Sequence, residues 1–412
     1  GQVCKTNTAP STAFRGFGGP KGMITIENIM EEIALFLKKE AFDVRQVNVY
    51  KRDDKTHYGQ IIEDAILPEL LQKIRQSSDY DRRRLEINEF NQKSKTHLRG
   101  LAATSLKFGI SFTTRFLNQA NALVNVFSDG SIQVSTGATE MGQGVYTKIA
   151  QVVADAFSVD LSHVRVMPSS TEKNSNTSPT AASSGSDLNG RAAEMACEMI
   201  KSRLSQVALQ VFNRPQEWRG RKTAGSGLAL EILIEENVKC SVIFKEGLVI
   251  DPKTQKEISF VDLIQEAYLN RVSLSGYGFY KYPDIYFNKE TGQGQPFFYY
   301  TNGTAVSEIS LDRYTGEMKV LRTDILMDLG RPLNQDIDRG QVTGAFVQGM
   351  GWLTTEKLFY NEKGVLKTHA PSTYKIPSVH DGPRVFHMDF LEPEENSIHA
   401  KNVKNLKGSK AV

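Results

Sequence analysis

The chain has 412 residues, which exceeds the size at which one hydrophobic core usually keeps growing, so two domains or subdomains are expected. Its hydrophobic content of 40%, charged content of 24% and net charge of +3 are ordinary for a soluble globular protein, and acids balance the Lys and Arg, which argues against nucleic acid as a main partner. Because no apolar run reaches the roughly 20 residues that span a bilayer and the start lacks the layout of a signal peptide, we expect a cytoplasmic protein with no membrane partner.

The first residue and the cysteines limit what the chain does alone. It begins with Gly1 and not Met, which is typical of a fragment or a processed chain. The three cysteines, Cys4, Cys197 and Cys240, are far apart and form no CxxC pair, so neither a disulfide framework nor a zinc site is indicated. An iron–sulfur cluster needs about four thiolates, so any cluster that serves this chain is expected on another domain or subunit.

The first half of the chain predicts helices and then strands. A Ser-, Thr- and Gly-rich loop precedes a predicted helix over 26–39, with Thr25 as its N-cap. Residues 51–95 are charge-dense with spaced apolar positions, which indicates helices that connect two globular parts. Alternating apolar residues predict a strand through 108–112 and a hairpin around Asp129-Gly130.

The second half alternates helical and hairpin patterns. Helices are predicted from Val145 and from Asp187, with Asp187 as an N-cap, and a further helix over 338–352. Residues 212–245 have no regular pattern, and a hairpin is expected near 312–318. The most economical fold class is therefore α+β, with mixed sheets and packed helices.

Three segments rich in small residues could approach a ligand closely. Residues 14–20 read FRGFGGP, where glycines flank Phe17; this is a ligand-facing loop or a structural turn. Residues 139–144 read TEMGQG before a helix, and residues 177–187 read TSPTAASSGSD before another. Each segment could form an anion site from the N–H groups at the start of the following helix. The alternative for 139–144 is a plain strand-to-helix turn, and the alternative for 177–187 is a flexible linker. With Gly340-Gln341 as a further segment, the set suggests a large cofactor with several polar anchors.

Other reaction classes find no support in the sequence. The seven histidines never fall in HExxH-like spacing, so no side-chain metal cage is indicated, and no GxSxG segment suggests a hydrolase.

Read together, these segments closely resemble the molybdenum-binding part of the xanthine dehydrogenase and aldehyde oxidase family. The matching pieces occur in the family's order over nearly the whole chain: 12–20 (TAFRGFGGP), 107–113 (KFGISFT), 139–144, 177–183 (TSPTAAS), 340–342 (GQV) and 371–377 (PSTYKIP). The first, second and last pieces favour the xanthine dehydrogenase branch, so purine is the implied substrate class. The resemblance implies two molybdopterin-binding subdomains, with residues 1–95 as the remainder of the first plus connecting helices and 96–412 as the second.

In that family the metal is held by the dithiolene of a molybdopterin, so the protein needs no cluster of metal-binding side chains of its own. Carried over by position, the resemblance implies Arg15 and Ala182 beside the molybdenum, without being side-chain ligands. It implies pterin contacts for Gln143, Ser183 and Gln341. For the purine it implies a sandwich between Phe17 and Phe112 and a hydroxyl contact from Thr113.

The resemblance also implies that the chain is incomplete. The family's catalytic base is a glutamate that directly follows Ser-Lys-Ala-Val, and here those are residues 409–412. No catalytic residue is therefore expected within this chain, and its partners would be iron–sulfur and FAD domains or subunits in a dimeric enzyme. Two alternatives stay open: an aldehyde or other N-heterocycle hydroxylase, and a non-catalytic cofactor-binding or assembly module.

Overall fold

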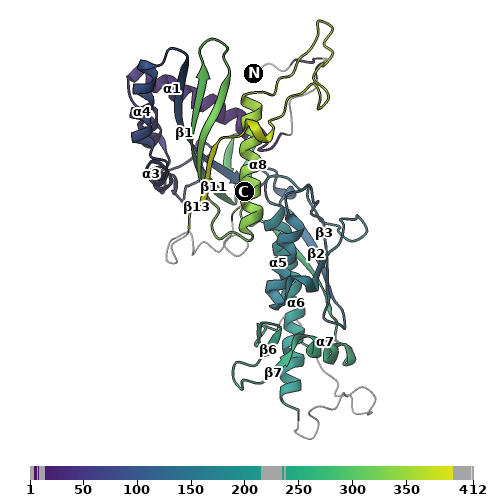
Figure 1. Cartoon of the computed structure of the whole chain (residues 1–412). Helices are drawn as coiled ribbons and strands as arrows, with labels where there is room; N and C mark the ends of the chain where they lie inside the picture. The colour runs from purple at the N-terminus through teal and green to yellow at the C-terminus, as the bar shows by residue number, and fades with distance from the viewer. Residues whose placement is uncertain are drawn as a thin grey trace.

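The structure, a computed structural model, describes residues 4–6, 8, 14–214, 234–235, 238–392 and 410. These residues form two lobes, each built around a four-stranded sheet, and helix α8 lies where the lobes meet (Figure 1). The helices are α1 (Gly19–Leu37), α2 (Ala41–Asn48), α3 (Leu67–Ser77), α4 (Tyr80–Lys93), α5 (Val145–Phe157), α6 (Gly185–Phe212), α7 (Phe260–Leu269) and α8 (Gln335–Leu353). Short 3₁₀ helices occupy Arg115–Leu117, Leu161–His163 and Val379–Asp381.

The strands are β1 (His97–Ile110), β2 (Gln119–Val126), β3 (Ile132–Thr136), β4 (Val164–Val166), β5 (Ile243–Lys245), β6 (Leu248–Ile250), β7 (Glu257–Ser259), β8 (Ser275–Lys281), β9 (Tyr286–Asn288), β10 (Gln293–Gln295), β11 (Tyr299–Asp312), β12 (Met318–Asp328) and β13 (Val385–Phe390).

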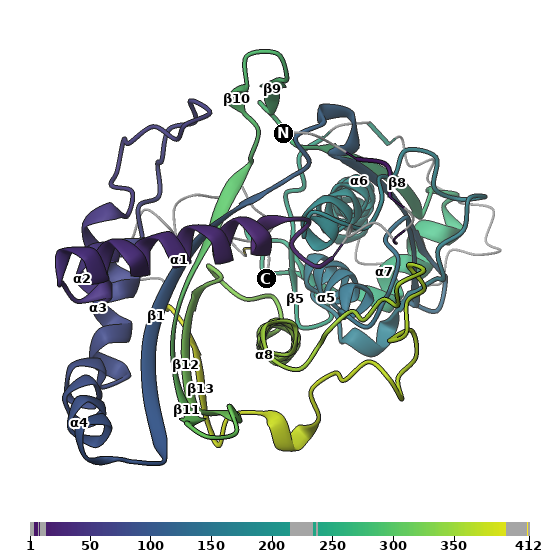
Figure 2. The ribbon, with the colours of Figure 1, turned by 90° about the horizontal axis from the view of Figure 1, so that it is seen from above.

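The first lobe is a sheet covered by helices on both faces (Figure 2). Its strand order is β1-β11-β12-β13, antiparallel except for the parallel pair β12–β13. On one face, Leu70 and Leu71 of α3 and Tyr80 of α4 form a core with residues of β1, β11 and β12. On the other face, Val342 of α8 packs against Ile325 and its neighbours. Because side chains alternate along a strand, the two apolar faces of β12 support both layers.

The second lobe is a sheet of order β4-β3-β2-β8, with α5 and α6 packed on it. Helix α6 crosses β8 at two glycines, and a Cβ built at Gly278 would lie 1.9 Å from the backbone oxygen of Ala192. Only glycine allows this approach, which sets the line of α6 and therefore the position of its N-terminus. The small sheet β5-β6-β7 and α7 lie at the far end of α6 (Figure 1).

The sequence expectations are confirmed for the α+β class with mixed sheets, for helices within 51–95, and for both hairpins. The helix predicted over 26–39 begins earlier, at Gly19, with Pro20 in its first turn. Thr25 is therefore not an N-cap: it lies inside α1, and its hydroxyl donates to the backbone oxygen of Lys21. Helix α2 was not predicted, since eight residues show too little periodicity.

Two further boundaries differ from expectation. Helix α6 begins at Gly185, so Asp187 is a buried residue of its first turn and not its N-cap. Strand β1 ends at Ile110, before Phe112.

Within the irregular 212–245 segment, residues 215–233 and 236–237 lie outside the described residues. The division at 95/96 stays a prediction; α3 and α4, which precede it, pack on β1, β11 and β12, which follow it. Among the described helices, none combines the length and apolar character that a membrane span requires.

Candidate functional site

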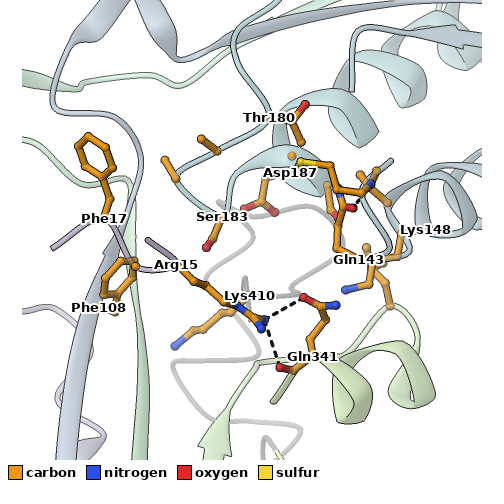
Figure 3. A pocket seen from close by; sticks show the side chains of 18 of the residues that line it. Arg15, Phe17, Phe108, Gln143, Lys148, Thr180, Ser183, Asp187, Gln341 and Lys410 are labelled. Atoms are coloured by element: carbon orange, nitrogen blue, oxygen red, sulfur yellow. Dashed lines mark hydrogen bonds between the residues drawn. The ribbon is translucent and has the colours of Figure 1, made fainter. Parts of the chain in front are cut away.

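A cavity of about 500 Å³ lies between the two lobes (Figure 3). This volume is within the usual range for small-molecule and cofactor sites. Its walls come from the loop before α1, the end of β1, the starts of α5 and α6, helix α8 and the C-terminal segment. The lining residues include Phe14, Arg15, Phe17, Phe108, Gln143, Lys148, Thr180, Ala182, Ser183, Asp187, Gln341 and Lys410.

Arg15 reaches across the cavity to α8. Its Nη2 donates to the side-chain oxygen of Gln341 at 3.0 Å and to the backbone oxygen of Gln341 at 3.1 Å (Figure 3). No carboxylate contacts Arg15 among the described residues. Partial burial lowers the pKa of Arg15, and a guanidinium nevertheless stays charged near neutral pH. The cavity thus holds a positive charge with free donors, which suits an anionic or carbonyl-rich ligand.

The start of α6 forms a second wall with open backbone donors. Ala182 and Ser183 both adopt left-handed backbone conformations, with φ of 56° and 55°, which turns the chain sharply into the helix. The N-cap residue Ser184 makes no side-chain capping bond, while Gly185 and Ser186 line the cavity. The N–H groups of the first turn therefore favour a ligand with negative charge.

The segment 139–144 behaves differently from the sequence expectation of an anion cradle. Glu140 accepts hydrogen bonds from the backbone N–H groups of Gly142, Gly144 and Tyr146, so its own carboxylate caps α5. Burial raises the pKa of Glu140, but the hydrogen bonds from these N–H groups together lower it by more, so the pKa lies below its ordinary value. Three N–H groups at and before this helix start are thus occupied by the chain's own carboxylate.

Gln143 lines the cavity but has local partners. Its side-chain nitrogen donates to the backbone oxygen of Thr139 at 2.8 Å, and its side-chain oxygen accepts from the backbone N–H of Met141. These two bonds close the turn before α5. A pterin contact from Gln143 would share or replace them.

Asp187 is a cavity residue that the sequence interpretation missed. Its carboxylate is 4% exposed and accepts from the hydroxyl of Tyr282 at 3.2 Å and from the hydroxyl of Tyr299. Burial raises the pKa of Asp187 to about 6, against the opposing effect of the two hydroxyls. Because Tyr299 begins β11 in the first lobe, Asp187 also ties α6 to that lobe. The sequence around Asp187 is typical of a helix N-cap, so the sequence interpretation gave Asp187 that role and missed its place in the cavity.

Two lysines complete the charged lining. Lys148 of α5 pairs with Asp338 of α8, and Lys410 pairs with Asp64 and Asp328. Neither position carried a sequence signal for a site. Lys410 itself lies at the cavity wall.

The predicted site residues are brought together in part. Arg15, Phe17, Gln143, Ala182, Ser183 and Gln341 all line the same cavity. Phe112 and Thr113 do not line it; Phe112 follows β1, where Asn118 bonds its backbone at 2.8 Å. Phe108 lies beside Phe17 instead (Figure 3). The expected purine sandwich between Phe17 and Phe112 stays a prediction, as do the substrate roles of Phe112 and Thr113.

The described residues contain no group of three or more His, Cys, Asp or Glu side chains that could hold a metal ion. A metal at this site would therefore be held by ligand atoms of a cofactor. The positive charge of Arg15, the uncapped start of α6 and the amide of Gln341 fit such an anionic, hydrogen-bonding group.

Family models for the molybdopterin cofactor-binding domain match residues 73–383 and residues 1–49. A xanthine dehydrogenase/oxidase of Felis catus is 42% identical over 97% of this chain. The chain spans only 27% of that relative's length.

Solved structures share the fold. Quinoline 2-oxidoreductase of Pseudomonas putida 86 aligns with a TM-score of 0.76 at 21% identity, over 97% of this chain and 47% of that one. Aldehyde oxidoreductase of Desulfovibrio desulfuricans aligns with a TM-score of 0.73 at 22% identity, over 97% of this chain and 37% of that one. At these identities the likeness concerns the fold alone.

Proposed function

Because the chain belongs to the molybdopterin cofactor-binding domains of the xanthine dehydrogenase family, we propose that it forms the cofactor-holding part of a purine-hydroxylating enzyme. The observation that carries this proposal is Arg15, a cation that no carboxylate of the described residues contacts, held by Gln341 across a cavity between two lobes.

The residues that would hold a molybdenum-molybdopterin cofactor are those that line the cavity. Arg15 and Gln341 would supply donors from two sides, and the first turn of α6 with Ser183 would bind polar oxygens of the pterin portion. Ala182 has only a methyl group, which leaves room beside the metal. When bound, the cofactor supplies the centre at which oxygen derived from water is inserted into the substrate.

The chain's own residues would orient substrate and cofactor. Phe17 is 81% exposed, so its ring is free to present a face to a flat heterocycle. The resemblance implies a glutamate base just after Val412, and Lys410, two residues before Val412, lies at the cavity wall. The place of Lys410 supports the proposal that the base acts at this cavity.

Electrons would leave through other parts of the enzyme. The described residues hold no cysteine cluster, and we infer that iron–sulfur and FAD domains or subunits, in a cytoplasmic dimer, act as partners.

Metal and pterin analysis of the full-length protein, combined with turnover of hypoxanthine in ¹⁸O-labelled water, tests this function. We expect equimolar molybdenum and pterin, and hydroxylated purine that carries ¹⁸O. A protein made in a host that synthesises the cofactor, yet isolated without pterin, would instead be a non-catalytic module.

One observation keeps an aldehyde or other N-heterocycle hydroxylase as the second candidate. Phe112 and Thr113, which the resemblance assigns to the purine, do not line the cavity. The same cofactor-loaded preparation, assayed with benzaldehyde and quinoline, decides between the candidates: turnover of either without turnover of hypoxanthine would favour the second.

A further inference from the structure

A buried ion cluster holds Lys410 at the wall of the cofactor cavity. The Nζ of Lys410 donates to the Oδ2 of Asp64 at 2.7 Å and also to the carboxylate of Asp328. The side chains of Lys410, Asp64 and Asp328 are 7%, 16% and 3% exposed. The backbone N–H of Lys410 donates to the backbone oxygen of Leu329 at 2.9 Å. Both the main chain and the side chain of Lys410 are therefore fixed, and we call the three charged residues the Lys410 anchor.

The anchor joins segments that are distant in sequence. Asp64 lies in the connection between α2 and α3, and Asp328 is the last residue of β12, where it pairs with Asn302 of β11. Lys410 reaches both and lines the cavity, where Figure 3 shows it with Arg15 and Gln341. The anchor thus forms only when the first-lobe sheet and the C-terminal part of the chain come together at the cavity.

The charges of the anchor make it specific for a cation at this position. Burial lowers the pKa of Lys410, but the charges of Asp328 and Asp64 together raise it by more, so the ammonium stays charged. Removing one member of a buried ion cluster leaves the other charges poorly compensated. Lys148, the other paired lysine of the cavity, bonds one carboxylate, that of Asp338. Lys410 bonds two, and this is the stronger restraint.

Covalent reach ties the anchor to the residues that come next in the chain. Each residue extends the backbone by at most ~3.6 Å, so the two residues after Val412 lie within about 15 Å of the Cα of Lys410. A side chain there is confined to the neighbourhood of the cavity for as long as the anchor holds.

We propose that the Lys410 anchor positions, at the cofactor cavity, the proton-accepting residue that follows Val412. This inference rests on the proposed function, which expects a glutamate base there. Lys410 is a positioning residue, because its ammonium is bound by Asp64 and Asp328 and it acts through the backbone. A base contributes roughly 10²–10⁴-fold to a rate only within hydrogen-bond reach of the proton that it takes.

Asp64→Asn in the full-length, cofactor-loaded enzyme is the main test, and Glu266→Gln is the matched control. The Arg214–Glu266 pair also has a distance of 2.7 Å, its side chains are 7% and 17% exposed, and neither residue is among those that line the cavity. Asp64→Asn should lower kcat for hypoxanthine at least about 10-fold, with KM and molybdenum content changed less than about 2-fold. Glu266→Gln should change kcat less than about 2-fold, although thermal melts should show similar destabilisation of both variants.

Two further readouts separate positioning from general loss of structure. Asp64→Asn removes a negative charge near the base, which should lower the pKa of the base and move the acid limb of kcat/KM to lower pH by a few tenths of a unit. Lys410→Arg, which keeps the cation, should retain a kcat several-fold higher than that of Lys410→Gln. Should Lys410→Gln fail to fold, Asp64→Asn against Glu266→Gln decides alone.

Hydrogen exchange at the backbone N–H of Lys410, read by mass spectrometry, tests the anchor without any turnover. Its exchange should be at least about 10-fold faster in Asp64→Asn than in wild type and unchanged in Glu266→Gln. An unprotected N–H in wild type, or an unchanged kcat in Asp64→Asn, would overturn the anchor while wild-type turnover left the proposed function intact. A cofactor-loaded wild type that turns over no hypoxanthine would instead overturn the proposed function.

Discussion

At the scale of single residues, the described residues that line the cavity include one carboxylate, that of Asp187, and three cationic side chains. Two tyrosine hydroxyls donate hydrogen bonds to one carboxylate oxygen of Asp187, yet burial keeps the pKa of Asp187 raised to about 6. The nearby charges of Lys148 and Arg191 act in the opposite direction and do not outweigh burial. Asp187 therefore changes its charge in the range where the enzyme is expected to work.

Asp187→Asn should alter how stability depends on pH. The folded-state pKa lies above the ordinary value of 3.8, so the stability that Asp187 contributes is present below about pH 4 and is lost as pH rises through about 6. The Asn variant should gain relative to wild type by up to about 3 kcal/mol between pH 4 and pH 7.5. Denaturant melts across this range measure it, and parallel curves for the two proteins would contradict it.

Phe17 and Phe42 form a matched pair for substitution by alanine. Phe17 is 81% exposed, whereas Phe42 is 1% exposed in the first-lobe core. Phe42→Ala should cost about 3–5 kcal/mol of unfolding free energy, and Phe17→Ala less than about 1 kcal/mol. Steady-state rates with xanthine should respond only to Phe17→Ala, through a raised KM and a lowered kcat/KM. Strong destabilisation by Phe17→Ala would place its ring in the core.

At the scale of elements, the two helices that begin at the cavity differ at their N-termini. Helix α5 is capped by Glu140 of its own preceding turn, and α6 has no side-chain cap. The close crossing of α6 over β8 holds the uncapped end in place. The dependence of this close crossing on Gly278 is testable.

Gly278→Ala should destabilise the second lobe severely, by more than about 3 kcal/mol, since the added methyl meets the backbone oxygen of Ala192. Gly349→Ala in α8 is the control, because a Cβ there has nothing within 4 Å. A glycine inside a helix costs roughly 0.5–1 kcal/mol relative to alanine, so the control should be stabilised by that amount. Thermal melts of both variants give the comparison; a neutral Gly278→Ala would show that the helix can move away.

The elements also show what the sequence could predict. Turn residues between apolar stretches identified both hairpins, and periodicity identified α5, whose apolar residues are buried. It placed the start of α1 too late, since a glycine in the left-handed conformation and Pro20 begin that helix without a side-chain cap. Asp187 has the pattern of an N-cap, and only the packing of Tyr299 from a strand 112 positions away makes it a buried cavity residue.

At the scale of the whole molecule, the cavity exists because strands distant in sequence form one sheet. β1 pairs with β11, and β12 with β13, so Ile110 lies opposite Tyr299 and Arg322 opposite Val385. Ordered family-like segments predicted that Arg15, Gln143, Ala182, Ser183 and Gln341 would gather, and the structure brings them to one cavity. The contributions of Lys148, Lys410 and Phe108 depend on how the lobes meet, which no local pattern encodes.

The most direct test of the account is the pterin and molybdenum content of the full-length protein with Arg15→Gln. Arg165→Gln on β4 is the control, since Arg165 is exposed and is not among the residues that line the cavity. We predict that Arg15→Gln loses most of its pterin and molybdenum while its unfolding free energy changes by less than about 1 kcal/mol, and that Arg165→Gln keeps both. Full pterin occupancy in Arg15→Gln would contradict the claim that this cavity holds the cofactor.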